Sequence, residues 1–300
     1  MIKPPYLKPG DTVGLVTPSS PIDRDEISNA LTIFESWGLQ VEEGSHLLMR
    51  NNQFAGTDTE RLDDFQKMLD NPDIRAIICA RGGYGVVRFL EQLDFTGFLK
   101  YPKWIVGFSD ITLFHLTVNE RLDCESIHGP MPVNLKTFNR GDEVVVNLHK
   151  ALFDGGLEYR FPGHQYNRSG EVTGKLIGGN LSIIYSTMGT GFFPDTGGKI
   201  LFIEDVGEYL YHLDRMLWSL KLAGKLSGLK ALIVGAMSGM KDKSLPFGKT
   251  AYEIIAEAVE PFDFPVIFNF PAGHISYNMP LIFGRTIRLS SSADISRINF

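Results

Sequence analysis

Hydrophobic positions in the first half of the chain alternate between short continuous runs and stretches with helical spacing. The continuous runs predict strands at residues 12–17, 39–42, 76–80 and 104–107. Between them, apolar residues recur every three or four positions, which predicts helices over residues 25–37, 59–69, 86–93 and 110–121. This alternation of strand and helix predicts a parallel sheet with helices on both faces.

A polar stretch that contains several glycines, at about residues 139–169, interrupts this pattern and predicts a junction between two domains. A second α/β pattern follows, with expected strands at 171–178, 199–206, 231–236, 266–270 and 281–289 and expected helices at 209–222 and 250–259. Gly284 lies inside the last expected strand, where it predicts a bend or a bulge.

The composition is ordinary for a globular protein and argues against several functions. Of 300 residues, 43% are hydrophobic and 21% charged, and the net charge of −6 comes from interspersed signs, unlike a nucleic-acid surface. No apolar window is long enough to predict a membrane span. Pro4, Pro5 and Pro9 interrupt the stretch where a signal peptide must be apolar. Cys79 and Cys124 are far apart and predict no disulfide framework. We therefore expect a cytoplasmic protein without nucleic-acid or membrane partners.

The first candidate for chemistry is a serine at the point where a predicted strand meets a predicted helix. Ser109 stands in the run GFSDIT, residues 107–112. Such a serine lies at the carboxyl edge of the sheet, against the free N–H groups of a helix, which is the geometry of a nucleophile elbow. The general pattern G-x-S-x-G is broken here by Ile111, and serine is also a favoured helix N-cap. These residues alone leave both interpretations open.

A glycine-rich loop, ARGGYG at residues 80–85, directly follows the third predicted strand. Its glycines let the backbone approach a ligand closely and direct N–H groups at it. In a hydrolase, the N–H groups of Gly83 and Asp110 could form an oxyanion hole. The alternatives are a tight turn or a phosphate cradle, although the spacing matches neither G-x-G-x-x-G nor the Walker pattern.

A nucleophilic serine needs a base, and position alone leaves two of the seven histidines as candidates. His128 and His274 each follow an apolar strand, whereas His115 lies six residues along the helix after the serine, on a different face. An orienting carboxylate could come from Glu204 or Asp205, because acids at the end of a buried strand are costly unless they are paired or catalytic. The alternative is that both acids favour the dipole of the following helix.

Together, these motifs resemble the LD-carboxypeptidase family of serine peptidases, which also includes the microcin C immunity peptidases. The resemblance extends over nearly the whole chain. It rests on ARGGYG and GFSDIT, on HGPM at 128–131, on GGNL at 178–181, on Glu204-Asp205 with Glu208, Tyr211, Asp214 and Arg215, and on Gly273-His274 with Asn278 and Pro280. It implies that Ser109 is the nucleophile, Glu204 the orienting acid and His274 the base, which decides between His274 and His128.

The resemblance also implies an α/β fold of two domains. A flavodoxin-like parallel-sheet domain at 1–140 is expected to carry the serine, and a junction is expected at 141–169. A C-terminal α/β domain at 170–300, with a swivelling or barrel-like sheet, is expected to carry the glutamate and the histidine. No metal and no cofactor are implied, and we expect a homodimer.

The implied reaction is hydrolysis of the L,D-peptide bond to a terminal D-alanine in murein tetrapeptides, during peptidoglycan recycling. The alternative is an immunity peptidase of the microcin C type, which cleaves acyl-aminoacyl-adenylates. The short segment 160–170, without a long aromatic insertion to hold an adenine, favours the first. A nonenzymatic nucleotide- or sugar-binding module that uses the glycine loop is a third interpretation, which the joint presence of the three triad residues disfavours.

A carboxypeptidase must also recognise a free carboxylate, and a guanidinium can bind one through two hydrogen bonds. Arg81, beside the glycine loop, is the best candidate, and the alternative is that it braces the loop by pairing with a nearby acid. Tyr84 and Asn180 are further candidates for contact with the muropeptide substrate.

Overall fold

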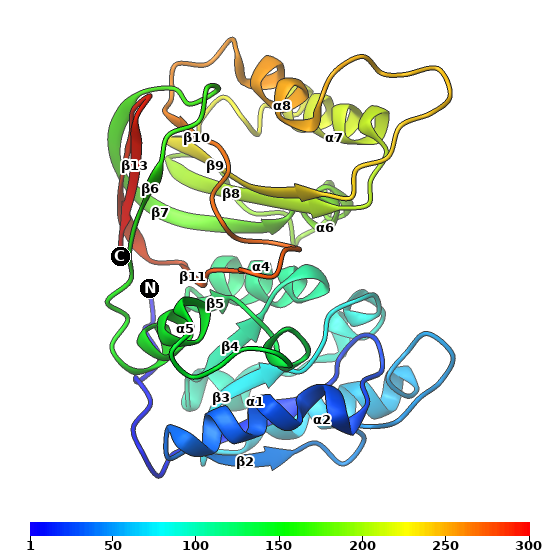
Figure 1. Cartoon of the computed structure of the whole chain (residues 1–300). Coiled ribbons are helices and arrows are strands. Elements are labelled where there is room, and N and C mark those ends of the chain that lie inside the picture. Colours follow the sequence, from blue (N-terminus) through cyan, green and yellow to red (C-terminus); the bar gives the residue numbers. More distant parts are fainter. The chain divides into compact units, whose positions relative to one another are not determined.

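The computed structural model describes residues 1–300 and divides the chain into two compact units. Unit 1 comprises residues 1–155 and 279–282, and unit 2 comprises residues 156–278 and 283–300. Each unit has its own sheet with helices packed against it (Figure 1). The predicted α/β fold class is therefore confirmed. None of the helices combines the length and the hydrophobicity that a membrane span needs.

Unit 1 contains a six-stranded sheet whose strands have the order β11-β5-β4-β3-β1-β2. The strands are β1 (Thr12–Val16), β2 (Gln40–Glu43), β3 (Ile74–Cys79), β4 (Trp104–Gly107), β5 (Ser126–His128) and β11 (Leu281–Phe283). Strands β1 to β5 pair in parallel, in the order 2-1-3-4-5 of a flavodoxin-like sheet. Parallel strands end at the same edge, so the loops that follow β1, β3 and β4 meet there.

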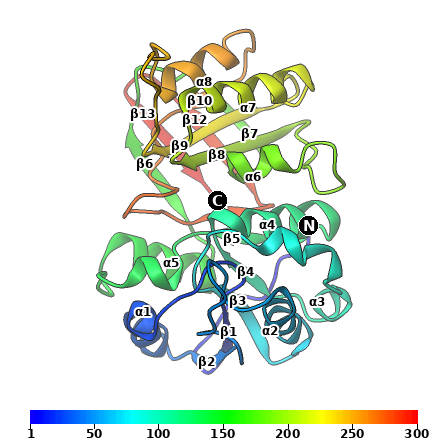
Figure 2. The ribbon, with the colours of Figure 1, turned by 90° about the vertical axis from the view of Figure 1, so that its right-hand side faces the viewer.

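Helices cover both faces of this sheet. They are α1 (Arg24–Ser36), α2 (Asp58–Asp70), α3 (Thr96–Lys100), α4 (Thr112–Arg121) and α5 (Glu143–Phe153). Figure 2 shows α1 and α5 on one side of the strands and α2 and α3 on the other. Capping boxes begin both long helices: Asp23 with Glu26 at α1, and Thr57 with Glu60 at α2.

Two segments of unit 1 differ from the sequence prediction. The helix expected at 86–93 is two 3-10 turns, Val86–Arg88 and Leu90–Gln92, because two adjacent β-branched valines favour a helix weakly and a carboxylate binds the first N–H. The stretch expected to be a polar junction contains α5. Its buried Val144, Val145, Leu148 and Leu152 have helical spacing, which the flanking polar residues concealed.

Unit 2 contains a seven-stranded mixed sheet in the order β10-β9-β8-β7-β12-β13-β6. The strands are β6 (Glu158–Pro162), β7 (Gly170–Asn180), β8 (Lys199–Val206), β9 (Ala231–Ser238), β10 (Val266–Ile267), β12 (Thr286–Ser291) and β13 (Ile295–Asn299). Strands β7 to β10 are parallel and the others antiparallel. A bridge between Arg168 and Val266 brings the segment before β7 against β10. The sheet is thus curved, without forming a closed barrel.

Three helices belong to unit 2: α6 (Leu181–Ser186), α7 (Leu210–Leu222) and α8 (Ala251–Val259). Helices α7 and α8 lie together over one face of the sheet (Figure 1). The acidic end of β8 and the loop after β10 leave the sheet at its carboxyl edge, where parallel α/β sheets commonly bind ligands.

Gly284 separates two strands that the sequence predicted as one. The segment before it is β11 of the first sheet, and the segment after it is β12 of the second. The glycine has φ +89. Its N–H donates to the carbonyl of Leu176, whose own N–H donates to Arg285. A left-handed residue reverses the chain where an extended one would continue the strand, so the expected bend is a change of sheet.

We expect Gly284→Ala to lower the free energy of unfolding by about 1–2 kcal/mol, because a side chain disfavours the left-handed backbone. Thermal and urea unfolding measure the change. Gly141→Ala is the control, since a Cβ at that exposed glycine meets nothing within 4 Å. Equal stability of the two variants would contradict the role given to Gly284.

Candidate active site

Ser109 in unit 1 has a strained backbone directly after β4. Its φ is +66, in the left-handed region, and it begins a 3-10 turn, Ser109–Ile111, that leads into α4. A non-glycine residue in this region costs about 1–3 kcal/mol and persists only where its surroundings impose it. A helix N-cap has an extended backbone, and the N-cap of this turn is Phe108. The geometry therefore favours the nucleophile elbow over the N-cap interpretation.

The glycine loop lies directly against this serine. A Cβ built on Gly82 would be 2.9 Å from Cβ of Ser109 and 3.3 Å from its Oγ. Gly83 has φ +127, and its Cβ would be 2.0 Å from Oγ of Ser20. Both positions therefore exclude a side chain, and Gly82 brings the backbone of the loop against Ser109. This proximity is what an oxyanion hole requires, and the assignment of its donors to Gly83 and Asp110 stays a prediction.

The side chain of Asp110 connects the loops around the serine. It is 1% exposed. Its Oδ2 accepts hydrogen bonds from Oγ of Ser19 at 2.6 Å and from the N–H of Val86 at 2.9 Å. Burial raises the pKa of Asp110 despite these hydrogen bonds and the charge of Arg61. The sequence motifs indicated a role only for the backbone N–H of this residue. The available signal for the side chain was an acid directly after a buried strand.

Glu204 and His274 form a hydrogen-bonded pair in unit 2. The carboxylate of Glu204, near the end of β8, is fully buried, and its Oε2 lies 2.7 Å from Nδ1 of His274. The same oxygen accepts from the backbone N–H of His274 at 3.2 Å. Because a carboxylate only accepts, Nδ1 carries the proton in the neutral ring, and Nε2 is then the basic nitrogen. This is the tautomer that a general base needs.

The environment of His274 favours its charged form. Burial by itself lowers the pKa of the imidazole, but the hydrogen bond and the charge of Glu204, with a smaller contribution from Asp205, outweigh it. The pKa of His274 is therefore raised above its ordinary value. A base that must hold a proton briefly during a reaction benefits from such stabilisation.

The loop that carries His274 is shaped around Glu204. Gly273 has φ +114, and its Cβ would lie 2.7 Å from Oε2 of Glu204. Its N–H donates to Oδ1 of buried Asn278 at 2.8 Å, and Oγ of Ser238 donates to the carbonyl of His274 at 2.9 Å. Glycine is thus required before the histidine, because a side chain would push the loop off the carboxylate.

Asn180 and Asp205 form the second layer around the pair. Nδ2 of Asn180 lies 3.3 Å from Oε1 of Glu204 and 3.0 Å from Oδ1 of Asp205, while its Oδ1 caps α6. Asp205 also accepts from the N–H and Oγ of Ser182, and burial raises its pKa. The two adjacent acids thus have different tasks: Glu204 contacts the imidazole and Asp205 the start of α6. The sequence had suggested Asn180 only as a substrate contact.

The other candidates from the sequence have protein contacts of their own. His128 is the last residue of β5, fully buried beside the ring of Phe108, and not in the loop after the strand as expected. Nη1 of Arg81 lies 3.5 Å from a carboxylate oxygen of Glu26, which is the contact expected if Arg81 only braces the loop. Tyr84 is 48% exposed on the glycine loop, beside Phe54. The substrate contacts of Arg81 and Tyr84 stay predictions.

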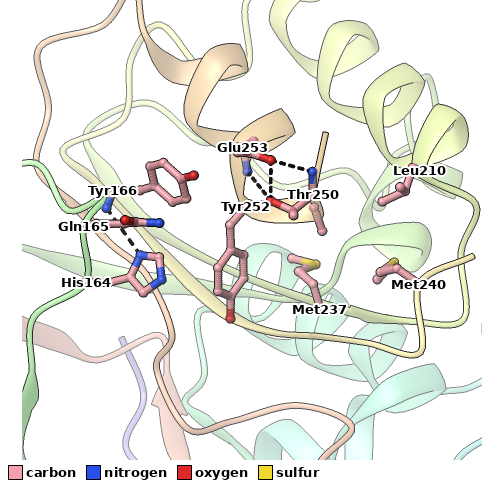
Figure 3. Close-up of a pocket in the computed structure, with 10 residues that line it drawn as sticks. His164, Gln165, Tyr166, Leu210, Met237, Met240, Thr250, Tyr252 and Glu253 are labelled. Atoms are coloured by element: carbon pink, nitrogen blue, oxygen red, sulfur yellow. Dashed lines mark hydrogen bonds between the residues drawn. The ribbon is translucent and has the colours of Figure 1, made fainter. Parts of the chain in front are cut away.

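A separate pocket of about 590 Å³ lies in unit 2, lined by aromatic, methionine and polar residues (Figure 3). Two of its side chains could carry chemistry, and both have structural partners. Nδ1 of His164 accepts the N–H of Tyr166, and the carboxylate of Glu253 accepts the N–H and the hydroxyl of Thr250 at the start of α8. The pocket contains none of the predicted triad residues.

One group of side chains has the spacing of metal ligands. Ligand atoms of His46, Asp63 and Asp64 lie within 4.8 Å of one another in unit 1. Asp64 contacts Nδ1 of His46 at 2.9 Å, and Asp63 pairs with Lys67 at 2.6 Å. Protein partners thus already occupy these carboxylates, and no predicted triad residue belongs to the group.

Comparisons with known proteins agree over both units. The family model of the LD-carboxypeptidase N-terminal domain matches residues 13–129, and that of the C-terminal domain matches residues 173–289. A probable murein peptide carboxypeptidase of Bacillus subtilis is 35% identical over 97% of this chain and 92% of its own length.

Solved structures show the same fold. A muramoyltetrapeptide carboxypeptidase from Oxalobacter formigenes has a TM-score of 0.87 and 27% identity, covering 96% of this chain and 98% of its own. The microcin C7 self-immunity protein MccF has a TM-score of 0.86 and 22% identity, covering 98% of this chain and 97% of its own. At that identity, the likeness to MccF concerns the fold alone.

We expect Glu204→Gln to lower the pKa of His274, because the amide removes the charge that raises it and leaves the burial that lowers it. NMR titration of the histidine ring measures the shift. Glu171→Gln, a change at an exposed acid on β7, is the control and should leave the pKa of His274 in place. An unchanged pKa in Glu204→Gln would contradict the pairing.

Proposed function

The chain belongs to the LD-carboxypeptidase family of serine peptidases, and from this membership we propose that it hydrolyses the L,D-peptide bond to the terminal D-alanine of murein tetrapeptides. We propose that Ser109, His274 and Glu204 form its catalytic triad. The observation that carries the proposal is the buried Glu204–His274 pair, whose proton arrangement leaves Nε2 as a base. The strained backbone of Ser109 supports the nucleophile. The names of the relatives support the substrate.

The proposed reaction proceeds through an acyl-enzyme. Oγ of Ser109 attacks the carbonyl carbon while Nε2 of His274 accepts the hydroxyl proton, and Glu204 stabilises the resulting imidazolium. The N–H groups of Gly83 and Asp110 stabilise the oxyanion. His274 then gives its proton to the leaving amine of D-alanine, and water hydrolyses the ester by the reverse sequence. The proposal requires Ser109 of unit 1 and the pair of unit 2 to come together in the reacting enzyme.

The proposed chemistry needs neither a metal nor a cofactor, because a hydroxyl nucleophile with its own base needs no metal-bound water. We further propose, as the sequence resemblance implies, that the enzyme acts in peptidoglycan recycling in the cytoplasm, as a homodimer. Light scattering of the purified protein tests the homodimer.

A second candidate function is cleavage of acyl-aminoacyl-adenylates, as in a microcin C immunity peptidase. The observation in its favour is the fold shared with MccF. Only residues 163–169 separate β6 from β7, so this loop is short for an adenine-binding insertion. We therefore favour the murein tetrapeptide. Offering both a tetrapeptide and an acyl-sulfamoyl-adenylate to the enzyme distinguishes the two.

We expect Ser109→Ala to lower kcat for a murein tetrapeptide by about 10⁴–10⁶-fold, because the attacking oxygen is lost while binding remains. His274→Ala should cause a loss of similar size. Release of D-alanine measures the rate. Ser169→Ala, at an exposed serine, is the control and should keep full activity.

His128→Ala distinguishes the two histidines that position left open. His128 is fully buried in β5 and makes ring contacts with Phe108 and His115, so its loss should affect stability more than chemistry. We expect a far smaller fall in kcat than for His274→Ala. Equal losses would leave His274 without its assigned role, and a Ser109→Ala enzyme with a tenth of the activity would refute the nucleophile.

We expect the enzyme to discriminate against a tetrapeptide with an amidated C-terminus by about 2–5 kcal/mol, because the guanidinium of Arg81 would lose the substrate carboxylate as a partner. Arg81→Gln should remove most of this preference for the free acid. The ratio of kcat/KM for acid and amide measures it. Glu26→Gln is the matched control, since it removes the ion pair and keeps the guanidinium. If Arg81 only braces the loop, both variants will behave alike.

Equal rates with acid and amide in the unmodified enzyme would refute the carboxypeptidase assignment.

A further inference from the structure

His115 of α4 contacts the backbone from which the Ser109 turn begins. Its ring is fully buried. Nε2 lies 2.9 Å from the carbonyl oxygen of Gly107, two residues before the serine, and Nδ1 lies 2.9 Å from Oγ of Ser126. The Gly107 carbonyl also accepts the N–H of Gly129 at 3.2 Å. The sequence had excluded His115 as a base because it lies on another face of the helix. The structure shows that its ring, on α4, contacts the backbone just before the turn that carries Ser109.

The hydrogen bonds around His115 determine where its proton lies. A carbonyl only accepts, so Nε2 must carry the proton and Nδ1 must accept from the hydroxyl of Ser126. Oγ of Ser126 in turn accepts from Nδ2 of Asn119 at 3.2 Å, which also donates to the carbonyl of Cys124 at 2.7 Å. Every donor in this series of hydrogen bonds then has an acceptor. Burial lowers the pKa of His115 to about 4, so the ring stays neutral at ordinary pH.

We propose that His115 is a positioning residue for the nucleophile, and this rests on the proposed role of Ser109. Its Nε2–H holds the Gly107 carbonyl and with it the Gly107–Phe108 peptide plane, one residue before the peptide that enters the left-handed serine. The backbone hydrogen bond that spans the serine, from the N–H of Ile111 to the carbonyl of Phe108, is long at 3.4 Å. A strained residue persists only while its surroundings impose it. A fixed donor on α4 supplies such a restraint and couples the helix to the turn.

The expected consequence is a loss of rate without a loss of binding. When the Gly107 carbonyl loses the donor on α4 and keeps only the N–H of Gly129, the turn can relax and Oγ of Ser109 moves from its reactive position. A misplacement of about 1 Å can cost about 100-fold in rate. Substrate contacts made elsewhere stay in place, so KM should change little. A residue that served only the stability of the fold would lower the folded fraction and leave kcat per folded molecule unchanged.

Two amide variants separate the donor to Gly107 from the polarity of the ring. In His115→Gln the amide nitrogen reaches the place of Nε2 and can still donate to the Gly107 carbonyl. In His115→Asn it reaches only the place of Nδ1. We expect His115→Asn to lower kcat by about 10- to 100-fold with KM within about twofold, and His115→Gln to keep most of the activity. The rate at which a fluorophosphonate modifies Ser109 should fall in parallel, because this small probe reports the nucleophile without peptide binding.

The outcomes distinguish this inference from the proposed function. If the probe fails to modify Ser109 in the unmodified enzyme and Ser109→Ala stays active, the proposed function itself is wrong. If the unmodified enzyme reacts and both His115 variants match it, or both fall equally per folded molecule, the positioning role is overturned. Should His115→Asn not fold, NMR of ¹⁵N-labelled histidine in the unmodified enzyme decides. A proton on Nε2 from pH 6 to 9 supports the assignment, and a proton on Nδ1 overturns it.

Discussion

The left-handed backbone of Ser109 is the constraint around which unit 1 is arranged. The residue leaves the sheet at the edge where parallel strands end, and a helix must begin within a few residues. Such a reversal leaves no room for side chains nearby, so glycine stands at 82 and at 107, where a Cβ would lie 2.9 Å from neighbouring side-chain carbons. The strain is held by contacts from several elements. Asp110 connects the loops after β1 and β3, and His115 contacts the carbonyl of Gly107.

Unit 2 meets a different constraint, which is the charge of a carboxylate placed inside a protein. Glu204 is fully buried, and an unpaired charge there would be costly. Its oxygens are satisfied by His274 and Asn180, and Gly273 brings the histidine loop close enough for both the ring and the backbone to donate. The same contacts that make the buried acid tolerable also set the tautomer of His274. In the proposed mechanism, the burial of the acid and the orientation of the base therefore depend on one hydrogen bond.

The two units thus prepare complementary groups by different physical means. Unit 1 holds an oxygen in a strained position by packing and by neutral or buried hydrogen bonds. Unit 2 holds an imidazole by charge, and the raised pKa of His274 records that interaction. In the proposed mechanism, the first supplies the nucleophile and the second the base. The supports of both are other residues of the motifs, such as Asp110 and Asn180, whose side chains have partners from distant parts of the chain.

The sequence by itself determined the α/β alternation, most of the strand positions and the family, because these depend on local periodicity and on short motifs, whereas β6 and β13 were not predicted. It also indicated Ser109, Glu204 and His274, through their motifs. Only the tertiary structure decided which groups meet. The hydrogen bond between Glu204 and His274 joins residues 70 positions apart. The ion pair of Arg81 with Glu26 joins the glycine loop to helix α1. The sequence did not reveal the change of sheet at Gly284 or the helix α5. A local pattern shows that a residue is apolar or that it turns the chain, but it does not show which surface that residue packs against.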